Sequence, residues 1–82
     1  MMPYIKRSKR SIKLLSIVAD AIDTEGELNY CITKLCLLYL GNNAHYEDYN
    51  RIMGVLISVQ HEFYRRYVAP YEDQKRKENG DV

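Results

Sequence analysis

Apolar residues recur every three or four positions along three stretches of this 82-residue chain, a spacing that places them on one face of an α-helix. The pattern predicts an extended basic arm over residues 1–7, helices over about 8–23, 25–40 and 45–68, and a short C-terminal helix over 70–79. The short connection after residue 40 makes the second and third helices antiparallel neighbours. The expected fold is therefore all-α, a single-domain antiparallel bundle of three main helices plus the short C-terminal one.

Local signals mark the ends of these helices. Thr24 and Glu27 fit a capping box, in which each side chain binds the backbone amide of the other residue. Gly41 follows the second helix, where a left-handed residue belongs. Pro70 predicts the end of the third helix, because proline disfavours helical geometry at Ala69 and supplies no amide. The apolar seam of the third helix is expected to contain Tyr49, Ile52, Leu56, Val59, Phe63 and Arg66.

The small size of the chain predicts self-association. A domain of this length buries only about 60–65% of its unfolded surface, so it needs disulfides, a metal or a partner chain. Cys31 and Cys36 are five residues apart on one helix, which puts them on different faces and out of reach of a disulfide. We therefore expect a homo-oligomer, most simply a two-fold dimer.

The same two cysteines, as reduced thiols, suit the cytoplasm. No apolar stretch reaches the length of a membrane span, and no signal peptide is visible. The expectation is a cytoplasmic protein that does not bind membranes.

Charge is distributed unevenly although the net charge is only +1. Residues 1–13 carry +5, residues 14–50 carry −5, and residues 51–82 carry +1. The basic arm can meet the acidic middle of a neighbouring subunit or an anionic ligand. A net charge so close to zero argues against nucleic acid as the main partner.

The segment from Glu62 to Asp73 holds three tyrosines, one phenylalanine and two arginines. Tyrosine can stack on a nucleotide base, and arginine presents a planar fork to phosphates. Its candidate ligand-binding residues are Tyr64, Arg65, Arg66 and Tyr71. The alternative is that the arginines pair with nearby carboxylates and lock the end of the helix.

Two further groups complete the candidate ligand site. Asn29 and Thr33 share a face near the start of the second helix, beside Tyr30, and polar groups there can form an anion or hydroxyl site. The plainer interpretation, a hydrogen-bonded helix surface, is the favoured one. Tyr4 and Lys6 belong to the basic arm and could reach a phosphate.

Catalytic and metal-binding patterns are lacking in the sequence. The run from His61 to Arg65 begins like a zinc-protease signature, but its fifth position is arginine where the second histidine is required. No nucleophile stands with a base and an orienting group, and there is no glycine-rich phosphate loop. We expect no enzyme activity, no metal and no cofactor.

Five segments of the sequence together resemble a known group of proteins. They are Met2–Lys6, Gly26–Thr33, Gly54–Leu56, Glu62–Asp73 and Glu78–Val82. Together they resemble a family of small uncharacterised proteins found in bacteriophage, bacterial and archaeal genomes. The resemblance spans nearly the whole chain and implies a phage or mobile-element context, but no activity.

Three functions stay open on this basis. The first is a non-enzymatic oligomer that holds a nucleotide-like anionic ligand between subunits, such as a cyclic nucleotide that serves as a host immune signal. The second is a protein–protein interaction module that inhibits a host factor or acts as a structural accessory. The third is an accessory protein associated with nucleic acid.

Overall fold

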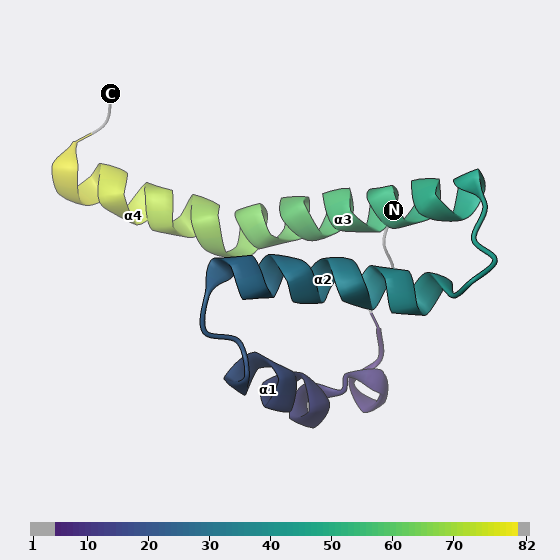
Figure 1. Ribbon diagram of the computed structural model, residues 1–82. Helices are drawn as coiled ribbons and strands as arrows, with labels where there is room; N and C mark the ends of the chain where they lie inside the picture. The colour runs from purple at the N-terminus through teal and green to yellow at the C-terminus, as the bar shows by residue number, and fades with distance from the viewer. Residues whose placement is uncertain (1–4, 81–82) are drawn as a thin grey trace. The chain divides into compact units, whose positions relative to one another are not determined.

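The computed structural model describes residues 5–80, and within them every regular element is a helix (Figure 1). The predicted all-α class is therefore confirmed. The elements are the 3-10 helix η1 (Arg7–Lys9), α1 (Ile12–Asp20), α2 (Glu25–Leu40), α3 (Tyr46–Phe63), the π-helical η2 (Tyr64–Val68) and α4 (Ala69–Asn79). The described residues divide into an N-terminal unit, residues 5–49, and a C-terminal unit, residues 50–80.

The start of α2 is fixed by the predicted capping box. The Thr24 hydroxyl accepts a hydrogen bond from the Glu27 amide at 3.1 Å. Glu27 Oε1 in turn accepts from the amides of Thr24 at 3.1 Å and Asp23 at 2.7 Å. These bonds satisfy amides that the first turn of a helix leaves without partners.

The end of α2 also follows its sequence signal. Gly41 has a φ of +78°, and its amide donates to the Leu37 carbonyl at 3.1 Å. Only glycine adopts a positive φ without steric cost, so the residue ends the helix where the pattern predicts.

The predicted break at Pro70 is wrong. α3, η2 and α4 follow one another without a gap, and Figure 1 shows one continuous helical ribbon from α3 into α4. Ala69 is helical, with φ −61° and ψ −45°, and its amide donates to the Tyr64 carbonyl five residues back. This wider π turn makes room for the proline ring, which in a regular α-helix clashes with the carbonyl four residues back.

The π turn also changes the predicted seam. Val68 lines an apolar hollow of about 340 Å³ with Leu56, Val59 and Phe63. Arg66, which the α-helical spacing assigns to the seam, instead binds the Glu62 carboxylate. The extra residue of a π turn rotates all that follows it, so the apolar side continues from Phe63 to Val68.

The described residues of neither unit form a core of their own. None of the residues in the described range 5–80 is buried, and large apolar side chains remain exposed along α1, α2 and α3. Cys31 and Cys36 are free thiols with partly covered side chains. Helices this short gain most of their stability from packing an apolar face, so these faces need a covering.

Within the described residues, none of the helices combines the length and the hydrophobicity that crossing a membrane requires.

Candidate functional site

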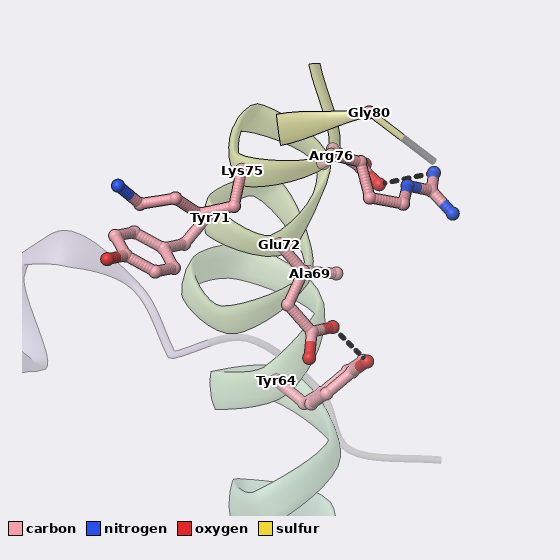
Figure 2. Close-up of a pocket in the computed structure, with 8 residues that line it drawn as sticks. Tyr64, Ala69, Tyr71, Glu72, Lys75, Arg76 and Gly80 are labelled. Atoms are coloured by element: carbon pink, nitrogen blue, oxygen red, sulfur yellow. Dashed lines mark hydrogen bonds and ion pairs between the residues drawn. The ribbon is translucent and has the colours of Figure 1, made fainter. Parts of the chain in front are cut away.

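The C-terminal unit has an open hollow of about 500 Å³ along η2 and α4. Figure 2 shows Tyr64 extending toward Glu72, and the Tyr71 ring lying beside the Lys75 side chain. Two of the predicted ligand-binding residues, Tyr64 and Tyr71, therefore line one surface. The remaining lining residues, which the sequence interpretation did not select for ligand binding, are Ala69, Glu72, Asp73, Lys75, Arg76 and Gly80.

Tyr64 and Glu72 are joined across the π turn. The Tyr64 hydroxyl donates to Glu72 Oε1 at 2.5 Å, a short bond of the kind expected with an ionised acceptor (Figure 2). This bond, and the negative charge of Glu72 beside it, raise the pKa of the Tyr64 phenol above its ordinary value of 10.0. The phenol thus stays protonated and is held in place at the edge of the hollow.

Arg65 and Arg66 do not line this hollow, because both turn to the carboxylate of Glu62. Arg65 binds Glu62 Oε1 at 2.7 Å, and the Arg66 Nε binds the other oxygen, Glu62 Oε2. The two guanidinium groups thus converge on one carboxylate. Their side chains stay 65% and 50% exposed, so water and dissolved anions reach both.

Charged side chains of α4 form further ion pairs with one another. Arg76 binds Asp73 at 2.9 Å, and Lys75 binds Glu78 at 3.3 Å. The Lys75 ammonium also lies 5.6 Å from the centre of the Tyr71 ring, within the range of a cation–π contact. The hollow therefore presents an aromatic face next to a cation.

The polar group on α2 forms its own local bonds. The Thr33 hydroxyl donates to the Asn29 carbonyl at 3.0 Å and lies 3.5 Å from the Asn29 side-chain oxygen. This is the hydrogen-bonded helix surface that the sequence favoured. Tyr30 lines an apolar notch of about 750 Å³, together with residues of α1, of α2 and of the connection between them.

The candidates of the basic arm are placed only in part. Lys6 is exposed at the start of η1, whereas Tyr4 lies outside the described residues. The candidates divide between the two units: Lys6, Asn29, Tyr30 and Thr33 in one, and the η2–α4 group in the other.

Within residues 5–80, no three His, Cys, Asp or Glu side chains gather where they could hold a metal ion. His45 directly precedes α3; its amide donates to the Asp48 carboxylate at 2.8 Å and its carbonyl accepts from the Asp48 amide at 3.0 Å. Its backbone therefore serves as the helix cap.

Residues 2–82 match the family described as a domain of unknown function (DUF6899), and the chain belongs to that family. No curated protein and no solved structure matches the chain.

Proposed function

We propose that this member of a family of unknown function is a non-enzymatic, homo-oligomeric binding protein. It holds a nucleotide-like anionic ligand between its subunits and acts in the cytoplasm, which is the host cytoplasm if a phage encodes it. In that setting the ligand is an immune signal of the host, and the protein removes it by sequestration.

The observation that carries this proposal is that no residue in the described part of either unit is buried. A folded chain normally buries its large apolar side chains, whereas Leu38, Phe63 and Tyr39 are 68%, 59% and 81% exposed. Small domains without disulfides or metals complete their cores against partner chains. A homo-oligomer supplies that partner at every copy of the chain.

The η2–α4 surface supports the ligand class. Tyr64 and Tyr71 offer ring faces for a base, and Lys75 lies beside one of them. Arg65 and Arg66 both bind the Glu62 carboxylate, and their side chains stay 65% and 50% exposed. Exposed ion pairs contribute little stability, so a phosphate with two charges can replace Glu62 as the partner of both arginines.

Calorimetric titration with cyclic dinucleotides, cyclic trinucleotides and ADP-ribose tests the ligand. We expect binding of at least one of them, and a loss of binding in the double variant Arg65→Gln/Arg66→Gln. Tyr71→Ala should weaken the same ligand through the lost ring face. Lys34→Gln removes a charge from α2 and should leave the affinity unchanged.

Two outcomes would count against this function. Absence of heat for all three ligand classes would remove the nucleotide-like ligand. Equal affinity of the arginine double variant and the Lys34→Gln control would remove the η2–α4 surface as its site.

A protein–protein interaction module is the second candidate, favoured by the same exposed apolar faces on α1, α2 and α3. An apolar helix face can lie in the groove of another protein as well as against its own copy. A single stoichiometric host protein that co-purifies with the chain, in place of self-association, would decide for this function.

A further inference from the structure

Residues 5–13 of the N-terminal unit form a cluster of positive charge. They contain five basic side chains and no acidic one. All five side chains, which we call the basic cluster, are exposed: Lys6, Arg7, Lys9, Arg10 and Lys13. Within residues 5–80 none of the five pairs with a carboxylate, whereas Lys75 and Arg76 of α4 both do. Charges that the fold does not neutralise attract an anionic partner.

α1 follows the basic cluster and has an apolar face beside it. Ile12, Leu15 and Ala19 are three and four residues apart, so they share one face of the helix. Ile12 and Leu15 are 64% and 57% exposed. They do not line the notch that α1 forms with α2, to which α1 contributes Ile17 and Val18. The face of Ile12, Leu15 and Ala19 is therefore open.

Backbone hydrogen bonds hold the basic cluster next to this face. The amide of Ile12 donates to the Arg10 carbonyl at 2.8 Å, and the amide of Arg10 donates to the Arg7 carbonyl at 3.1 Å. The Arg10 Nε donates to the Ile5 carbonyl at 3.0 Å, which ties the two ends of η1 together. Charge and apolar surface thus belong to one short, folded segment.

The combination of charge and apolar surface distinguishes between the classes of anionic partner. Nucleic acid attracts lysine and arginine through its phosphates, but these phosphates offer no contact to an apolar helix face. The surface of an anionic bilayer attracts the same cations, and the acyl chains below its headgroups take up apolar side chains. A basic segment joined to an amphipathic helix is typical of proteins that bind such a surface.

We propose that residues 5–19 bind reversibly to the surface of an anionic lipid bilayer. The basic cluster lies at the headgroups, and Ile12 and Leu15 enter the boundary of the acyl chains. This contact goes beyond the proposed ligand binding and uses other residues. The expectation that the chain does not bind membranes rested on the lack of a stretch long enough to span one, and a helix that lies in the interface needs no such length.

Co-sedimentation with lipid vesicles tests this proposal. The full chain should bind vesicles of equal parts phosphatidylglycerol and phosphatidylcholine at least about tenfold more tightly than vesicles of phosphatidylcholine alone. High salt should remove most of this difference, because it screens the charges. Equal binding to both kinds of vesicle, or binding to neither, would overturn the proposal.

The six lysines of the chain provide two matched variants. Lys6→Gln/Lys9→Gln/Lys13→Gln should weaken binding to the anionic vesicles at least about thirtyfold, because each charge near the surface strengthens it about fivefold. The control removes the three other lysines and should weaken binding less than about threefold, since charges far from the bilayer are screened. It is Lys34→Gln/Lys75→Gln/Lys77→Gln. Equal losses in the two variants would contradict the proposed contact.

A tryptophan probe tests the apolar contact independently of the lysine variants. The chain has no tryptophan, so Ile12→Trp gives a single emission signal. On addition of the anionic vesicles this emission should move to shorter wavelength, because the ring enters the acyl-chain boundary. Tyr71→Trp places the same probe in α4 and should show no change. An unchanged emission at position 12 would mean that the apolar face takes no part, and the proposal would fail.

A DNA duplex of random sequence decides between the two classes of anionic partner. The chain should stay on the anionic vesicles when duplex is added at the same concentration of phosphate. Displacement from the vesicles by the duplex would assign the basic cluster to nucleic acid and would overturn the membrane contact.

Discussion

Among single residues, Tyr64 has the side chain whose chemistry is most altered by the fold. Its hydroxyl donates to Glu72, and ionisation of the phenol would remove that donor and put a second negative charge beside the carboxylate. The bond therefore stabilises the folded chain only while the phenol is protonated. Its contribution is fully present below pH 10.0 and is lost as the pH rises through the raised pKa of Tyr64.

Subtracting the near-ultraviolet titration of Tyr64→Phe from that of the wild type should isolate this phenol from the other tyrosines. We expect the difference curve to have its midpoint above 10.0, the ordinary pKa. Glu72→Gln should bring the midpoint down, because it removes the adjacent charge. A midpoint at or below the ordinary value in the wild type would contradict the Tyr64–Glu72 bond.

Substitution of Gly41 and of Gly54 by alanine should change the free energy of unfolding in opposite directions. Gly41 has a positive φ, so Gly41→Ala should destabilise the chain by about 1 kcal/mol. Gly54 lies inside α3 with nothing within 4 Å of an added Cβ, so Gly54→Ala should stabilise it by about 0.5–1 kcal/mol. Urea unfolding of both variants measures the two effects. Destabilisation by Gly54→Ala would instead indicate that another chain approaches the helix closely there.

At the scale of the helices, the stability of α2 depends on the hydrogen bonds of its first turn. Thr24→Ala removes the hydroxyl that accepts from the Glu27 amide and should lower the free energy of unfolding by about 1 kcal/mol. Thr24→Ser keeps the acceptor and should retain most of that stability. Chemical denaturation followed by circular dichroism measures both, and equal losses in the two variants would exclude the cap as the cause.

Both ends of α2 could be predicted because their signals are local. The Thr24–Glu27 bonds span three residues, and the conformation of Gly41 follows from its lack of a side chain. The continuation through Pro70 could not be predicted in the same way. Proline stops a helix when the preceding turn is α-helical. No single residue in the sequence indicates that Tyr64–Val68 forms the wider π turn.

The contacts of the candidate site could also be predicted only in part from the sequence. The pairing of Arg65 and Arg66 with Glu62 was one of the alternatives, since residues three and four apart on a helix are neighbours. The Tyr64–Glu72 bond spans eight residues and depends on the π turn, so α-helical spacing does not suggest it. Lys75 could have been found from its position four residues after Tyr71.

At the scale of the whole molecule, the lack of a buried residue within positions 5–80 makes the stability depend on protein concentration. If the subunits cover one another's apolar faces, unfolding releases separate chains, and dilution favours the unfolded state by mass action. We expect the melting temperature to rise by several degrees for each tenfold increase in protein concentration. Calorimetric scans over a hundredfold range measure this, and an unchanged melting temperature would indicate that single chains fold alone.

The five-residue turn before Pro70 limits which codon deletions the helix can tolerate. Elsewhere in a surface helix, swapping one side chain for another leaves the remaining positions where they were. Deleting a single codon between Tyr64 and Val68 would instead close this turn to α-helical geometry, which keeps the direction of α4 but brings the proline ring back against the carbonyl four residues before it.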